Sequence, residues 1–279
     1  MGRFTFLAAA IVAVLVCPVT GAAPTRQRAA EPAPSASIEE ALRLFYSGRY
    51  EAAAALTLDP CFSLPNGLAA CEVRATALLF QIKRALGDAA DKQKALKQCA
   101  PCPELFTAFL ATTVKGKALA AERLKADPEE CATLFLLGKL NLNHVWLQTG
   151  TLGRKTGWNE YWDGRRAVEK VLKQNPNHVR ARVARAWIDY IVDTRIPRGT
   201  RWLFGGGNKK RGLRVVREAA AAESDFFSQV EARFALWDMQ VRERDLQEAV
   251  ITARTLARDF PENPELTRFI ETHEHLIQH

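Results

Sequence analysis

The sequence predicts an all-α protein in which helical hairpins stack side by side into an α-α superhelix. Apolar residues recur at helical spacing, proline-containing stop signals recur along the chain, and no stretch alternates apolar and polar residues as a strand would. Hydrophobic residues make up 48% of the chain and charged residues 25%, which is ordinary globular composition. Such a chain can build its own core, and we expect neither a metal nor another cofactor.

The first 23 residues have the features of a secretory signal peptide. Arg3 provides a positive start, residues 6–16 form an apolar run, and small residues follow before position 24. The run is too short for a stable membrane anchor. Val16 precedes Cys17 where a lipoprotein would need a small residue. We therefore expect residues 1–23 to be cleaved, the protein to be periplasmic or secreted, and no integral membrane segment to remain.

Residues 24–36 are rich in alanine, proline and charge, which is typical of a flexible linker, so the folded domain is predicted over residues 37–279. The net charge of +8 becomes +7 when Arg3 is removed with the signal peptide. A mildly basic exported protein can favour acidic partners, although the same charge also serves solubility alone. We expect a protein partner and no nucleic acid.

Five cysteines remain after cleavage, and an oxidising compartment favours disulfides between them. Cys61 and Cys71 bracket a Pro-Asn-Gly turn, so we predict that they pair. Either Cys99 or Cys102 is expected to join Cys131, which leaves the other cysteine over.

Cys99 and Cys102 form a CAPC motif, which suggests a redox dithiol as an alternative. That chemistry usually places the first cysteine at a helix N-terminus after a strand, where its pKa falls. Here residues 94–98 read as the end of a helix, and no strand precedes the motif. No second cysteine pair follows at the spacing of a zinc site.

Proline marks most of the predicted helix ends. Asp127 is predicted to cap a new helix with Pro128 in its first turn, and Asn263 with Pro264 repeats the pattern. The segments that contain these stop signals are LTLDP at Pro60, LKADP at Pro128, LKQNP at Pro176 and LARDFP at Pro261.

The boundaries are spaced like repeats, because Pro128 and Pro176 are 48 residues apart and another 48 residues end at Ser224. Within the units, apolar residues of 179–191 and 227–241 fall on single helical faces. One hairpin cannot bury such a stripe alone, so neighbouring hairpins must stack.

These features resemble those of tetratricopeptide-repeat (TPR-like) proteins. In Gly48–Leu56, GRYEAAAAL, a glycine ends the first helix and a tyrosine packs across the turn. Residues 231–264 are the fullest copy, while residues 61–127 match poorly. The resemblance implies an α-solenoid that binds other proteins on a concave face. The packing positions of the fullest copy are Ala232, Leu236, Leu246, Ala249, Ala253 and Pro261.

Two insertions, residues 150–172 and 196–218, occupy equivalent places in successive repeats, with Arg166 aligned to Arg211 and Val168 to Leu213. Matching loops of a stacked array emerge on the same edge. Neither loop follows a strand as a P-loop does. The edge would carry Arg154, Lys155, Trp158, Trp162, Arg165, Arg166, Arg201, Trp202, Asn208, Lys209, Lys210 and Arg211.

Cations fill the first turn of both helices that follow the insertions. Asn208 is a predicted N-cap before Lys209, and Asp163 is a predicted N-cap before Arg165 and Arg166. The positive end of a helix dipole disfavours cations there. Amide donors and basic side chains would together hold a phosphate, a sulfate or a partner's carboxylates. The alternative is a solvated basic edge whose tryptophans pack between repeats.

The sequence therefore predicts an exported, non-catalytic protein that mediates protein–protein interaction in the cell envelope. An alternative is a small-ligand or anion-binding periplasmic protein, of the solute-uptake accessory type, that uses the two basic loops. A third is a thiol-redox protein acting through Cys99 and Cys102. No set of nucleophile and base with supporting local context indicates an enzyme.

Overall fold

The computed structural model describes residues 36–63, 67–87, 89–154 and 156–277. The predicted signal peptide, 1–23, and all but the last residue of the predicted linker, 24–36, lie outside the described residues. Within the described ranges every regular element is a helix and no strand occurs, so the predicted all-α class is confirmed. No helix among them combines the length and the apolarity needed to cross a membrane.

The N-terminal part begins with a hairpin of two helices, α1 and α2. Gly48, at a φ of +76°, lets the chain reverse between them, as the sequence indicates. Pro60 does not end a helix as predicted; it lies in the first turn of α3, where its missing N–H costs nothing. The elements are α1 (Ala36–Tyr46), α2 (Tyr50–Leu56), α3 (Leu58–Ser63), α4 (Leu68–Leu86), α5 (Lys92–Gln98) and α6 (Cys102–Ala126).

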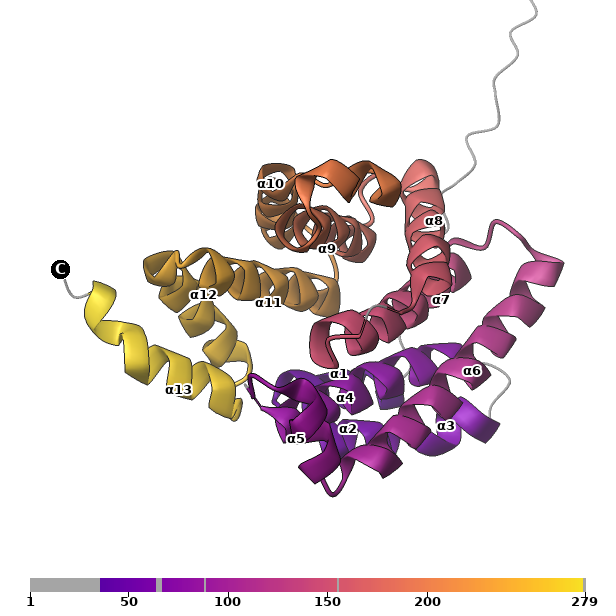
Figure 1. Cartoon of the computed structure of the whole chain (residues 1–279), viewed down its shortest axis with the longest axis horizontal. Coiled ribbons are helices and arrows are strands. Elements are labelled where there is room, and N and C mark those ends of the chain that lie inside the picture. The colour runs from indigo at the N-terminus through magenta and orange to yellow at the C-terminus, as the bar shows by residue number, and fades with distance from the viewer. Residues whose placement is uncertain (1–35, 64–66, 88, 155, 278–279) are drawn as a thin grey trace, which may run out of the picture. The chain divides into compact units, whose positions relative to one another are not determined.

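The rest of the chain is a succession of hairpins, α7 with α8, α9 with α10 and α11 with α12 (Figure 1). Each hairpin also packs on the next, because α8 contacts α9 and α10 contacts α11. This confirms the predicted stacking. The elements are α7 (Cys131–Val145), a π-helical turn (Trp146–Thr151), α8 (Trp158–Gln174), α9 (Val179–Arg195), a 3₁₀ segment (Arg198–Phe204), α10 (Lys209–Ala221), α11 (Phe226–Glu243), α12 (Leu246–Asp259), α13 (Pro264–His273) and a final 3₁₀ turn (Glu274–Ile277).

Two glycines fix how the helices cross within successive hairpins. A Cβ on Gly164 would lie 3.0 Å from the side chain of Leu142, and one on Gly212 would lie 3.4 Å from the backbone of Tyr190. The two glycines differ by 48 in residue number, and so do their two partners. The 48-residue repeat is thus present in the packing, because only glycine allows the helix backbones to approach so closely.

This register corrects the alignment of the two insertions. Arg211 corresponds to Asp163, and the predicted match of Arg166 with Arg211 is three residues out of step. The predicted cap at Asp163 is also wrong. Gly157, with a φ of +97°, turns the chain early, so α8 begins at Trp158 and Asp163 lies inside the helix.

Two other predicted helix starts have different outcomes. Asp127 and Pro128 belong to a turn, in which the Asp127 carboxylate accepts the backbone N–H of Glu129 at 3.0 Å, and α7 begins only at Cys131. Asn263 does cap α13, since its side chain accepts the N–H of Glu265 at 2.9 Å.

Helices α4, α7, α9 and α11 converge on a buried charge cluster, made of Glu72, Lys139, Arg180 and Glu231. The Glu231 carboxylate lies 2.6 Å from both the Lys139 ammonium and the Arg180 guanidinium. Glu72 is 3.9 Å from the first and 3.6 Å from the second. The side chains of these four helices therefore contact one another at this cluster.

Aromatic packing joins the first helix to the last hairpins beside this cluster. The Tyr46 ring stacks on Phe234 at 5.1 Å between centroids and touches Phe260 at 5.7 Å. The side-chain amide of Asn263 donates to the Tyr46 carbonyl at 2.7 Å. Residues more than 200 positions apart therefore share one core.

The cysteine pairing is partly as predicted. Cys61 and Cys71 form a disulfide, which confirms the favoured pair. Cys99 bonds to Cys102, so the predicted bridge from either of them to Cys131 is wrong. The end of α5 and the start of α6 bring Cys99 and Cys102 together locally, while Cys131 begins α7 after the whole length of α6.

Candidate functional site: an arginine-lined groove

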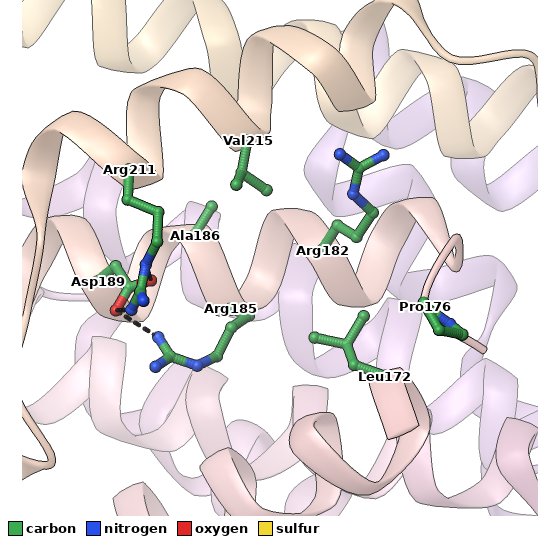
Figure 2. A pocket seen from close by; sticks show the side chains of 8 residues that line it. All are labelled: Leu172, Pro176, Arg182, Arg185, Ala186, Asp189, Arg211 and Val215. Carbon is green, nitrogen blue, oxygen red and sulfur yellow. Dashed lines mark hydrogen bonds and ion pairs between the residues drawn. The ribbon is translucent and has the colours of Figure 1, made fainter. Parts of the chain in front are cut away.

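A cavity of about 330 Å³ lies between the end of α8, the outer face of α9 and α10 (Figure 2). Three of its lining residues are arginines and one is an aspartate, over an apolar floor. We call it the arginine groove. The lining residues are Leu172, Pro176, Arg182, Arg185, Ala186, Asp189, Arg211 and Val215.

Asp189 anchors one end of the arginine groove. Only 5% of its side chain is exposed, yet its carboxylate receives two guanidinium groups. Arg185 approaches one oxygen at 2.6 Å, and Arg211 donates to both oxygens at 2.8 and 2.9 Å (Figure 2). The hydrogen bonds to Asp189 raise the pKa of Arg211. A carboxylate held in this way is a pairing group for cations and not a free base.

Arg182 stands at the other end of the groove and donates to Glu218 at 2.8 Å. Arg185 also reaches back to Glu169 on α8, at 3.3 Å. Each guanidinium has five N–H donors in a rigid fork, and these pairs occupy only some of them. The three arginines line a concave space whose floor is apolar.

The floor is made of side chains from all three helices. Ala186 of α9, which is 1% exposed, lines it together with Leu172 from α8 and Val215 from α10. A ligand that suits this arrangement carries a carboxylate for the arginines and a small aliphatic group for the floor.

At the start of α10, next to the groove, the basic residues pair with acidic residues of the same chain. Asn208 caps the helix as predicted, accepting the N–H of Arg211 at 2.8 Å. The backbone N–H of Lys209 donates to Asp193 at 2.7 Å, and its ammonium lies 2.7 Å from Glu243. An internal carboxylate thus lies where the anion hypothesis places an external ligand, and Lys210 remains exposed beside it.

Arg165 is buried and forms hydrogen bonds with the loop that precedes α10. Its guanidinium donates to the carbonyls of Phe204 and Gly205 and, at 2.8 Å, to the Glu169 carboxylate. Its charged end lies 5.6 Å from the Trp162 ring. Arg165 therefore positions the loop of residues 205–207 and does not face a ligand.

The other predicted residues of the second insertion lie along the 3₁₀ segment. Arg201 pairs with Asp193. Trp202 is 73% exposed and bonds only to the Gly199 carbonyl among the contacts described, at 3.1 Å. Trp158, from the first insertion, is 49% exposed and lies 4.7 Å from the Phe204 ring.

Two predicted residues of the first insertion make contacts of their own. Arg166 pairs with Asp163 along the exposed side of α8, and Arg154 lies over the Phe106 ring at 5.8 Å. Lys155 lies outside the described residues. The structure thus joins parts of the two insertions around Phe204, and the anion-binding role of the loops stays a prediction.

The acids and arginines of α9 that organise the site were not among the residues predicted from the sequence. Arg182, Arg185 and Asp189 recur at helical spacing on one side of α9, away from its apolar stripe. A polar stripe of this kind is normally solvated. The sequence pattern alone therefore does not distinguish a binding groove from an ordinary exposed helix face.

Comparisons with known proteins give a weak likeness to a solved structure. No family model matches the chain, and no curated protein matches it. Among solved structures, the chain is similar to a thermophilic TPR protein of Thermus thermophilus, with 15% identity and a TM-score of 0.47. That likeness covers 84% of this chain and 96% of the other. The class of the protein, an α-α hairpin repeat, is defined by its own helix packing.

Proposed function

We propose that this protein is an exported, non-catalytic interaction protein, periplasmic or secreted, that binds an acidic and partly apolar segment of a protein partner in the cell envelope. The observation that carries the proposal is the arginine groove, where Arg182, Arg185 and Arg211 stand over an apolar floor with one carboxylate among them.

The groove is suited to recognition because its arginines are already held in place. Asp189 and Glu218 fix the guanidiniums before a ligand arrives, so little side-chain entropy is lost on binding. Arginine forks match carboxylates in a bidentate way, and the basic net charge, +8 for the whole chain and +7 once Arg3 is removed, favours the approach of acidic partners.

The arginine groove is better suited to docking a partner than the buried charge cluster is. The charged side chains of α4, α7, α9 and α11 pair with one another at the buried charge cluster, where Glu231 has only 12% of its side chain exposed. A partner segment finds its cationic contacts on the opposite side of α9, in the groove.

A small anionic ligand is the second candidate function, favoured by the size of the groove. Its volume of about 330 Å³ lies near the lower end of the range for small-molecule sites, roughly 300 to 1,000 Å³.

The test is selection of displayed random peptides on the protein isolated from the envelope compartment, followed by titration of the selected peptides. We expect sequences with Asp or Glu beside a small aliphatic residue. Arg182→Glu should weaken their binding at least about tenfold, which corresponds to ~1.4 kcal/mol. The intact mass of the same preparation tests export, because cleavage near residue 23 removes a defined segment.

Arg214→Glu is the matched control. Arg214 lies on α10, pairs with the same Glu218 at 3.7 Å and is not among the groove's lining residues. It should change binding less than about twofold. Equal losses in the two variants would contradict the groove as the docking site. Stabilisation by small dicarboxylates with no peptide selected would favour the second candidate, and an uncleaved mass would contradict export.

A further inference from the structure

The two disulfides of the protein lie in different surroundings. Cys61 and Cys71 are both 0% exposed, between α3 and α4. Cys102 is 1% exposed, but its partner Cys99 is only half-buried. The second pair is therefore the one with a partly exposed cysteine, at which an incoming thiolate can approach.

The backbone keeps Cys99 and Cys102 close whether or not their bond exists. Cys99 directly follows α5, Cys102 begins α6, and the N–H of Cys102 donates to the Cys99 carbonyl at 3.3 Å. The bond spans three positions, against ten for Cys61–Cys71. It therefore restricts the unfolded chain less, and a role as a stabilising crosslink accounts for it less well.

The charges around the pair favour a thiolate. Cys102 is the first residue of the 25-residue helix α6, whose dipole and free amide groups stabilise a negative charge there. The preceding helix α5, KQKALKQ, contains three lysines and no acid. Lys92 and Lys97 also line a small cavity of about 160 Å³ with Arg154. The exposed Glu104 in the first turn of α6 acts in the opposite direction.

From these observations we infer that Cys99–Cys102 is a thiol–disulfide exchange centre that accepts two electrons from a dithiol of an exported protein. A thiolate of the partner attacks the Cys99 sulfur and forms a mixed disulfide, while the Cys99–Cys102 bond breaks and Cys102 leaves as a thiolate. The second thiol of the partner then attacks its own sulfur in the mixed disulfide. This releases Cys99, closes the partner's disulfide and passes two protons to the two cysteines.

The buried disulfide of the same chain serves as an internal control. The protein is equilibrated with mixtures of reduced and oxidised glutathione, quenched with an alkylating agent and mapped by mass spectrometry, while circular dichroism follows the helices. We expect Cys99 and Cys102 to be alkylated at glutathione ratios where Cys61 and Cys71 stay bonded and the helical signal is unchanged. Reduction of both pairs together, or only with loss of helix, would overturn the inference.

Single variants test the direction of attack. Cys102→Ala should collect glutathione on Cys99, while Cys99→Ala should collect at least about ten times less on the buried Cys102. Equal amounts of bound glutathione in the two variants would contradict the inference that Cys99 is the sulfur that is attacked. A reduced peptide with two cysteines should be oxidised by the unaltered protein at least about ten times faster than by the variant that lacks both Cys99 and Cys102. Equal rates would contradict exchange with a partner. None of these readouts involves the arginine groove, so they stand apart from the proposed function.

Discussion

Two arginine–carboxylate clusters lie on opposite faces of the same helix, α9, and they are built for different purposes. Arg180 belongs to the buried charge cluster, where two acids and two bases from four helices contact one another. Two residues later, Arg182 points into the arginine groove, where its partner Glu218 has 52% of its side chain exposed.

The difference is how completely each set of charges is satisfied by the protein itself. In the buried cluster each cation lies within 4.0 Å of both carboxylates, which leaves little capacity for a ligand. In the groove three guanidiniums pair with Asp189, Glu169 and Glu218, and the side chains of Glu169 and Glu218 are 38% and 52% exposed. The first arrangement fixes how the helices pack, and the second lies at a surface that a partner can reach.

The largest expected effect comes from breaking the buried cluster. Glu231→Gln removes the carboxylate that both Lys139 and Arg180 approach at 2.6 Å and leaves two buried cations with Glu72 alone. We expect the free energy of unfolding to fall by about 3 to 5 kcal/mol. Chemical denaturation followed by circular dichroism measures it.

Glu122→Gln is the control for this variant. Glu122 pairs with Lys125 on the surface of α6, where both side chains are about 70% exposed. Its loss should cost less than about 0.5 kcal/mol. If the two variants are equally stable, the buried charge cluster does not hold these helices together.

The pH dependence of stability sharpens the same comparison. Burial opposes ionisation of Glu231, but Arg180 and Lys139 outweigh it and lower its pKa from 4.5 to about 2. The contribution of this group is therefore complete above pH 4.5 and disappears as the pH falls through about 2. The stability difference between the unaltered protein and Glu231→Gln should shrink across that window. A constant difference from pH 7 downward would show that Glu231 is not held ionised by its neighbours.

The helices and their repeat could be predicted from the sequence because both depend on the local spacing of residues. Asn208 and Asn263 were recognisable caps, and the 48-residue period between Pro128 and Pro176 reappears in the packing of Gly164 and Gly212. The early start of α8 was not recognisable, because it depends on Gly157 adopting a left-handed conformation after an irregular loop.

The candidate site was less accessible to sequence analysis because its contacts join distant residues. The cations at the start of α10 suggested an external anion. Their carboxylates are Asp189 and Asp193, on the preceding helix, and Glu243 on the following one. Only the folded chain shows which surface charges are already paired and which face a groove.

The smallest expected loss of stability comes from a substitution in the arginine groove. Asp189→Asn keeps the size of a buried side chain but removes the charge that Arg185 and Arg211 share. Forty-eight positions earlier the chain has Asn141, which is 1% exposed, so the fold accepts an asparagine here. We expect a loss of about 1 to 3 kcal/mol in the free energy of unfolding, because hydrogen bonds to a charged group are weakened and not all removed.

The same substitution should loosen the start of α10 before the whole protein unfolds. Arg211 and the loop around Gly207 are held against α9 partly through Asp189, so amide hydrogen exchange should accelerate around the start of α10 while α12 stays protected. Asp163→Asn, at an exposed pair on α8, is the matched control and should alter neither measurement. If Asp189→Asn accelerates exchange uniformly over both helices, Asp189 stabilises the fold as a whole and does not act as a local anchor of the groove.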